Sequence, residues 1–231
     1  QNGIIQLESH GQNGTIATDI DYLAMAQYCS NTNLTCVMPM PYGPRYEGLA
    51  SGLYEELYQK SVTGAIAFMR GSGYRLACVE EGRFHLCVMS HLAFEYYEQQ
   101  GKDIQMVAAF GSRSYVEQHR IFVRPDFDGN WQGCKVGLDT SSVDQELLTR
   151  FCFADKPVQY FPSIYSHLVP FLHNGMIDAG VWSADMLPEG LSYYPMPCLD
   201  EQEKDTVAVL VCRKSDNVTA QLVRKVLSVQ N

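Results

Sequence analysis

The feature that most constrains the fold is an alternation, along nearly the whole chain, of short apolar runs with amphipathic stretches. Most of the apolar runs are bounded by Gly, Pro or Ser, which favours buried strands of a parallel sheet. Strands that alternate with helices favour right-handed βαβ units, and therefore mostly parallel sheets with helices on both faces. The predicted strands span residues 34–38, 65–69, 84–89, 104–110, 121–123, 135–138, 158–161, 177–181 and 207–212.

The stretches between these runs have the apolar spacing of helices. Leucines recur at every fourth residue after Pro44, which predicts a helix of about four turns that begins near Arg45. The same spacing over residues 164–172 includes Pro170, which should kink or shorten that helix. The other predicted helices span residues 18–29, 143–151 and 218–227.

The alternation is interrupted between residues 111 and 134, where turn-forming residues dominate and only one short strand is indicated. A β-α-β pattern then restarts at Lys135. We therefore predict two α/β lobes. Residues 34–112 together with 206–231 form the first, and residues 113–205 form the second.

Composition excludes several classes of protein. With 46% hydrophobic residues, the chain of 231 residues can bury a sizeable core and is not disordered. It has no uncharged apolar run long enough for a membrane-spanning helix, so we expect no membrane partner. Acidic residues outnumber basic ones by 26 to 17, and the basic residues form no cluster, so this chain should not supply the main contacts to nucleic acid.

The eight cysteines include no Cys-x-x-Cys pair, and several lie within apolar runs. This pattern favours buried free thiols in a cytoplasmic protein, and disulfides in an exported protein remain the alternative. The chain starts at Gln1 without a secretory leader, and we expect it to be part of a longer protein.

Sequence motifs of common enzymes and metal sites are absent. The chain has no Gly-x-Ser-x-Gly elbow, no His-Glu-x-x-His and no glycine trio of a dinucleotide-binding fold, and its six histidines have no metal-ligand spacing. We therefore expect no metal, no cofactor and no catalytic residue. If the chain were an enzyme, its candidate groups would be Cys87, His91 and Asp185.

The candidate ligand site lies where strands lead into helices. In open α/β sheets ligands bind at the carboxyl ends of strands, opposite helix N-termini whose free amides favour anions. Arg45 and Arg70 lie in two such turns, and each can hold a carboxylate or phosphate in bidentate fashion, which predicts an anionic or zwitterionic ligand. The candidate ligand-binding residues are Tyr42, Arg45, Tyr46, Arg70, Gly71, Ser72, Ser90, His91, Asp139, Thr140, Ser141, Ser142, Tyr165, Trp182 and Ser183.

Several of these residues also have purely structural interpretations. Ser, Thr and Asp before a helix are ordinary caps, and Ser142 has the capping-box spacing to Gln145. The turn at residues 70–73 lacks the Gly-Lys-Ser/Thr of a phosphate-binding loop and is compatible with a plain turn. Trp182 after a strand suits a ligand wall and a core position equally.

Three segments resemble type II periplasmic binding proteins. They are KVGLDTSS at residues 135–142, LHNGMIDAGVW at 172–182 and EGRFHLCV at 81–88, the last with His85 where that fold more often has Asp. The resemblance covers roughly residues 34–231. It implies a two-lobed α/β fold, in which each lobe is a mostly parallel sheet flanked by helices and a small ligand lies between the lobes.

Residues 3–17 resemble the wing hairpin of a GntR-type winged helix, and the chain as a whole resembles the YhfZ family, whose members are regarded as transcriptional regulators. The resemblance implies that residues 1–17 are a remnant of the wing and linker and that 18–33 form a linker or dimer helix. We expect a cytoplasmic, homodimeric domain that senses a small-molecule effector and reaches DNA only through an upstream domain. A transporter's solute-binding protein, which needs an upstream signal peptide or lipid anchor, and an enzyme on the same fold are the alternatives.

Overall fold

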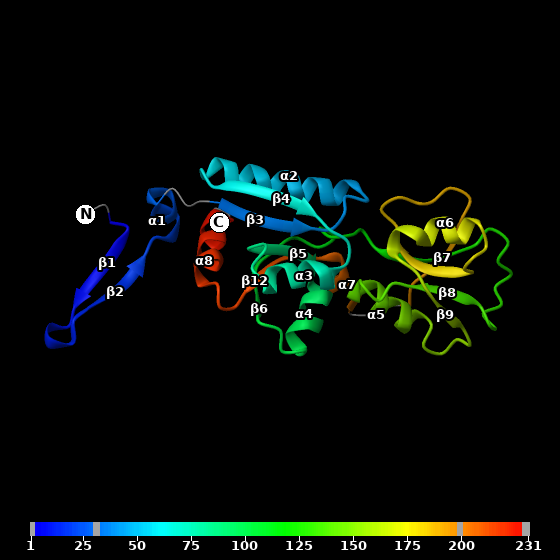
Figure 1. Cartoon of the computed structure of the whole chain (residues 1–231). Coiled ribbons are helices and arrows are strands. Elements are labelled where there is room, and N and C mark those ends of the chain that lie inside the picture. Colours follow the sequence, from blue (N-terminus) through cyan, green and yellow to red (C-terminus); the bar gives the residue numbers. More distant parts are fainter. Residues whose placement is uncertain (1–2, 30–32, 198–200, 228–231) are drawn as a thin grey trace.

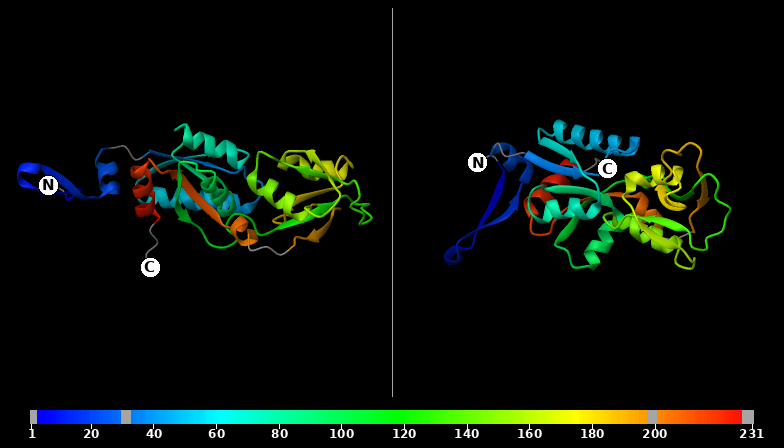
Figure 2. Two further views of the ribbon diagram at one scale, coloured as in Figure 1. Left: turned by 90° about the horizontal axis from the view of Figure 1, so that it is seen from below. Right: turned by 45° about the vertical axis from the view of Figure 1, so that its right-hand side comes forward.

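Two five-stranded sheets form the body of the molecule, and a separate two-stranded sheet precedes them. The computed structural model describes residues 3–29, 33–197 and 201–227. The N-terminal hairpin, lobe 1 and lobe 2 follow one another along the long axis of the molecule, as Figures 1 and 2 show. No helix in the described part of the chain is long and apolar enough to cross a membrane.

Lobe 1 contains the sheet with strand order β4-β3-β5-β12-β6, in which β12 runs antiparallel to both neighbours and β3 runs parallel to its own. The reversed strand belongs to the returning C-terminal part of the chain. The elements of lobe 1 are β3 (Asn33–Met38), α2 (Pro44–Gln59), β4 (Thr63–Phe68), α3 (Ser72–Glu80), β5 (Leu86–Ser90), α4 (His91–Gln99), β6 (Ile104–Ala109), β12 (Ala208–Arg213) and α8 (Asn217–Val226).

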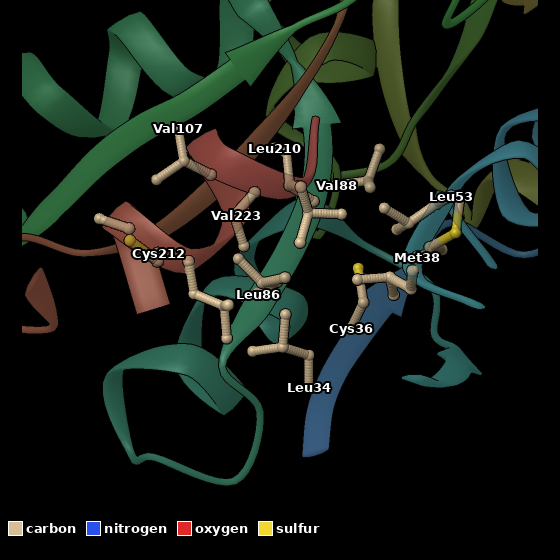
Figure 3. Close-up of a cluster of buried hydrophobic side chains, with 14 of the residues drawn as sticks. Leu34, Cys36, Met38, Leu53, Leu86, Val88, Val107, Leu210, Cys212 and Val223 are labelled. Carbon is tan, nitrogen blue, oxygen red and sulfur yellow. The ribbon is translucent and has the colours of Figure 1, made fainter. Parts of the chain in front are cut away.

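Helices cover both faces of the lobe 1 sheet because its central strands are apolar on both sides. On one face the strands pack against α2 and α8, and Figure 3 shows Leu34, Leu86, Leu210 and Val223 of that cluster. On the other face they pack against α3 and α4. Asp216 caps α8 by accepting a hydrogen bond from the Thr219 amide at 3.1 Å.

Lobe 2 contains the sheet with strand order β11-β7-β10-β8-β9, in which β7 runs against the other strands. Gly137 lies on this sheet beneath α6, where a side chain would overlap Leu168, so the glycine allows the close approach of the helix. The elements of lobe 2 are β7 (His119–Val123), β8 (Lys135–Leu138), α5 (Val143–Cys152), β9 (Gln159–Pro162), the 3-10 turn η2 (Tyr165–His167), α6 (Leu168–His173), β10 (Ala179–Ser183) and β11 (Ser192–Pro195).

Two segments that lie side by side connect the lobes. One leads from β6 to β7, and the other leads from β11 through α7 (Glu201–Thr206) to β12. The Tyr115 amide donates to the Thr206 carbonyl at 2.7 Å, and the Ala208 amide donates to the Ser114 hydroxyl at 2.9 Å. The chain therefore enters and leaves lobe 2 at the same place.

The N-terminal segment differs from the predicted helix over residues 18–29. β1 (Ile5–Ser9) and β2 (Thr15–Ile20) form an antiparallel hairpin that projects away from lobe 1 (Figure 1). Because β2 continues to Ile20, the helix α1 spans only Tyr22–Tyr28, and the Asp21 side chain caps it. Within the segment 18–33 that we predicted as a linker or dimer helix, residues 30–32 lie outside the described residues.

Each predicted strand overlaps an observed one, whereas β11 and α7 have no predicted counterpart and α3 and α4 follow predicted strand-to-helix turns without a predicted range. As Pro170 implied, the helix around it is short, and a 3-10 turn precedes it. The seven cysteines in the described part of the chain are free, and all but Cys29 are buried. Cys198 lies outside the described residues.

Candidate functional site

A pocket lies between the lobes, where the turns after β3 and β4 face the turn between β8 and α5. It encloses about 580 Å³ of space, part of it open to solvent. We call it the interlobe pocket. Seven candidate ligand-binding residues line it, namely Tyr42, Tyr46, Arg70, Gly71, Asp139, Ser142 and Tyr165. The remaining lining residues are Pro39, Met40, Arg75, Tyr115, His119, Asp144 and Gln145.

The two lobes touch directly at one edge of this pocket. Gly71 precedes α3 with a φ of 70°, and a Cβ atom there would lie 2.6 Å from the Ser141 carbonyl oxygen of lobe 2. The Val143 amide at the start of α5 donates to the Ser72 hydroxyl at 3.4 Å. Gly71 and Ser72 thus bring the N-terminal ends of α3 and α5 together, and Ser72 is buried by the contact.

Ser90 and Asp144 join the lobes behind the pocket. The Ser90 hydroxyl caps α4 by accepting from the Ala93 amide at 3.0 Å, and it donates to the Asp144 carboxylate of α5. Burial, together with the negative charge of Asp205, raises the pKa of Asp144 to about 7. Ser90 is fully buried, so its hydroxyl holds two helix ends together.

His119 at the start of β7 forms a buried ion pair with Asp205 of α7. Burial alone lowers the pKa of His119, but the charge of Asp205 and the hydrogen bond to it outweigh burial, so the pKa is raised. The second carboxylate oxygen of Asp205, Oδ1, is buried and has no hydrogen-bond partner among the described residues.

Arg75 is the one buried arginine that the structure describes, and sequence reasoning missed it. Its guanidinium donates to the carbonyls of Val88 at 2.9 Å and Met69 at 3.0 Å, and to the Tyr115 hydroxyl at 3.2 Å. The available signal was an arginine on the apolar face of α3, next to the buried Leu76. Arg75 therefore connects the middle of β5, the turn after β4 and the segment between the lobes at the pocket.

Arg45 does not line the interlobe pocket, in contrast to its predicted role as a ligand clamp. Its Nε donates to Asp185 at 2.8 Å, its Nη1 donates to the Arg113 carbonyl at 2.7 Å, and its Nη2 pairs with Glu117. Since Arg45 belongs to α2 and Asp185 follows β10, the pair connects lobe 1 to lobe 2. The guanidinium of Arg45 is therefore already paired with groups of the protein itself.

The other candidate residues lie around the interlobe pocket in separate places. Trp182 stacks on Tyr165 with 3.8 Å between ring centroids, and with Ser183 it lines a neighbouring pocket of about 830 Å³. Thr140 and Ser141 line a third pocket of about 1190 Å³, which shares Arg70 with the interlobe pocket. His91 lines none of these three pockets.

The capping box predicted for Ser142 and Gln145 is wrong. The Ser142 side chain caps no amide of α5. Gln145 instead accepts from the Asp139 amide at 2.6 Å and donates to the Gly137 carbonyl at 3.3 Å, so it stabilises the turn between β8 and α5. Asp139 in turn accepts from the Tyr165 amide at 2.8 Å, which fixes this wall of the pocket.

The described residues contain no group of three or more His, Cys, Asp or Glu side chains that could hold a metal ion. Among the groups considered for catalysis, Cys87 is fully buried, and burial raises the pKa of its thiol to about 12, which makes it a poor nucleophile. Asp185 is occupied by Arg45 and by the Glu117 amide at 2.9 Å.

Comparison with known proteins identifies the family of this chain. The model of the YhfZ C-terminal domain family matches residues 21–231. The uncharacterized protein YhfZ of Escherichia coli K12 is 30% identical over 230 residues, which are 98% of this chain and 75% of that protein. The crystal structure of YhfZ from Shigella flexneri is 31% identical, with a TM-score of 0.74 over 90% of this chain and 89% of that one.

More distant structures have the same fold. The substrate binding protein of a methionine transporter from Streptococcus pneumoniae has a TM-score of 0.64 at 10% identity, over 85% of this chain and 87% of that one. The periplasmic aliphatic sulphonate binding protein SsuA from Escherichia coli has a TM-score of 0.61 at 14% identity, over 85% and 70%. The predicted fold class is therefore confirmed. The chain belongs to the YhfZ family and contains its C-terminal domain.

Proposed function

We propose that this chain is the effector-binding domain of a transcriptional regulator and that it holds a small anionic or zwitterionic molecule in the interlobe pocket. The observation that carries the proposal is the lining of that pocket. Arg75, Asp144 and Gln145 come from both lobes, are almost fully buried and face one shared space. Convergent polar groups in a concave pocket are typical of small-molecule sites.

The polar lining is costly for a purely structural interface. A buried charge loses its hydration, and apolar side chains would join two lobes at a lower cost. Three tyrosines, Tyr42, Tyr46 and Tyr165, add aromatic walls from both lobes. A small ligand that contacts groups of both lobes would favour the closed arrangement, because it binds that arrangement better than the open one.

The regulatory part of the proposal concerns the N-terminal segment. We propose that residues 1–17 are the end of an upstream winged-helix domain and its linker, that 18–33 join it to the lobes, and that the lobes comprise 34–112 with 206–231 and 113–205. The hairpin at residues 5–20 crosses the boundary at residue 17, but it supports a neighbouring upstream domain, because a two-stranded sheet with exposed apolar side chains is marginal by itself. DNA would then be bound by the upstream domain.

A coupling free energy of about 1–3 kcal/mol between ligand binding and domain placement would be enough to change operator affinity. We propose a homodimer, which would bind an operator with two half-sites, and a cytoplasmic location. The buried free thiols of six described cysteines support a reducing compartment.

A fluorescence experiment tests the binding proposal. Trp182 stacks on Tyr165 beside the pocket, whereas Trp131 packs with Phe127 and Phe153 in the lobe 2 core. The variant Trp131→Phe therefore leaves one tryptophan that reports on the cleft. Thermal stability and tryptophan emission are measured with acids, phosphates, amino acids and neutral sugars.

A ligand of the cleft should raise the melting temperature and change the Trp182 emission together. Full-length protein with its upstream domain should then change operator affinity when that ligand is added. If no compound class changes either signal, the binding part of the proposal is wrong. If a compound binds but leaves operator affinity unchanged, the regulatory part is wrong.

A further inference from the structure

The buried charges around the interlobe pocket are unequally compensated. Asp144 and Asp205 are 5% and 2% exposed. Among the described residues, the Ser90 hydroxyl is the one side chain that donates to the Asp144 carboxylate. Asp205 has an ion pair with His119 on one oxygen and no hydrogen-bond partner on Oδ1. A buried carboxylate is stable only when it is paired with positive charge or hydrogen-bonded throughout.

The nearby arginines form no ion pair with the Asp144 carboxylate. Burial raises its pKa, and the charges of His119 and Arg75 offset only part of that rise. The donors of Arg75 go to two backbone carbonyls and a tyrosine hydroxyl, none of which is negatively charged. Arg45 is already paired with Asp185 and Glu117. The first turn of α5 offers Asp144 a partial positive charge, but a helix end equals only about half an elementary charge.

The exposed edge of the pocket has a positive charge without a paired anion. Arg70 lines the interlobe pocket, is exposed, and has no hydrogen bond or ion pair with another described residue. It lies one residue before Gly71, at the contact between the lobes. The pocket therefore has an uncompensated carboxylate inside and an uncompensated guanidinium at its edge.

Because of this arrangement, we infer that the interlobe pocket selects a small zwitterion of the α-amino acid class, with its ammonium group at Asp144 beside the Asp205–His119 pair and its carboxylate at Arg70. The inference rests on the proposed function and narrows it. The ammonium group supplies the cation that the Asp144 carboxylate lacks, and the Tyr42, Tyr46 and Tyr165 rings contact the rest of the molecule.

The experiment uses matched probes with the full chain. Titration calorimetry compares the standard L-amino acids with their 2-hydroxy-acid analogues, which keep the carboxylate and lack the ammonium group, and with the corresponding decarboxylated amines. We expect at least one amino acid to bind about 10-fold or more tightly than both analogues, since each analogue leaves one charged group of the pocket unpaired.

Two variants and two controls test which residue binds the ammonium group and which binds the carboxylate. Asp144→Asn should remove the preference for the amino acid over its hydroxy acid, and Arg70→Gln should weaken the amino acid and the hydroxy acid alike. Asp155→Asn changes a carboxylate that is 89% exposed, and Arg83→Gln changes a surface arginine paired with Glu81. Neither control should alter the preference.

The outcomes separate the two proposals. If a hydroxy acid, phosphate or sugar binds as tightly as any amino acid, the zwitterion inference is wrong while the binding function stands. If an amino acid binds but Asp144→Asn keeps its preference over the hydroxy acid, the ammonium position is wrong. The comparison of amino acids with their analogues uses the wild type, so it tests the inference even if a variant fails to fold. If nothing binds and Trp182 emission never changes, the proposed function fails as well.

Discussion

Replacing Asp144 by Asn should stabilise the ligand-free protein, and the gain should grow with pH. Asn has nearly the same shape and can still accept the hydrogen bond from the Ser90 hydroxyl. In the folded chain burial raises the pKa of Asp144 from its ordinary 3.8 to about 7. The folded state therefore favours the protonated carboxyl. Its contribution to stability is fully present below about pH 4 and is lost as pH rises through 7.

The size of the effect follows from the two pKa values. The full difference corresponds to roughly 4 kcal/mol of unfolding free energy, at about 1.4 kcal/mol for each pKa unit. Between pH 5 and pH 8 the wild type should lose roughly 3 kcal/mol of it, because the unfolded chain is already ionised at pH 5. Relaxation around the buried charge lowers this value, so we expect Asp144→Asn to gain about 1–3 kcal/mol over the wild type across that range.

Urea denaturation followed by circular dichroism measures this difference at a series of pH values. Asp155→Asn is the matched control, because its carboxylate is exposed and should show no pH-dependent gain. A stability difference between Asp144→Asn and the wild type that stays constant from pH 5 to pH 8, or that shrinks, would refute the reasoning.

Three further predictions concern the cleft and the fold. Gly71→Ala should keep the lobes apart, because its Cβ would lie 2.6 Å from the Ser141 carbonyl oxygen; small-angle scattering should give a larger radius of gyration. Gly101→Ala has a similar positive φ but no atom within 4 Å, so it is the control for backbone strain alone. Gly137→Ala should lower the free energy of unfolding by about 1–3 kcal/mol, because the new methyl group overlaps Leu168; an unchanged urea midpoint would contradict this. Amino-acid binding should tighten from pH 6 to pH 8 and release a proton, since an ammonium ligand needs the ionised carboxylate; calorimetry in buffers of different ionisation enthalpy measures this, and an enthalpy independent of the buffer would argue against it.

The positions of most strands along the chain were accessible from the sequence, because apolar runs indicate burial on both faces of a sheet. The run at residues 135–138 is an observed strand with the same bounds. β11 escaped prediction because Ser192–Pro195 is exposed and has no apolar alternation. The predicted helix from Thr18 shortened because strand pairing in the hairpin continues to Ile20.

The candidate site was accessible only in part, because pairing between distant residues cannot be inferred from local pattern. Tyr42, Arg70 and Asp139 were found from their turns, which do face one space. Arg45 has the same local signature as Arg70, and only the fold reveals that Asp185 neutralises it. Asp144 looked like an ordinary acidic residue of a helix first turn, and its burial depends on Ser90 from the other lobe.

The two connecting segments are hydrogen-bonded to each other, so lobe 2 resembles a domain inserted into lobe 1. Its entrance and exit are held together where Tyr115 meets Thr206, while the strands before it and the β12 and α8 elements after it belong to lobe 1. A short loop could in principle replace the whole of lobe 2 without breaking the remaining sheet order. Conversely, a rotation of lobe 2 acts on the N-terminal hairpin through lobe 1, because α1, which follows the hairpin, packs against the lobe 1 core.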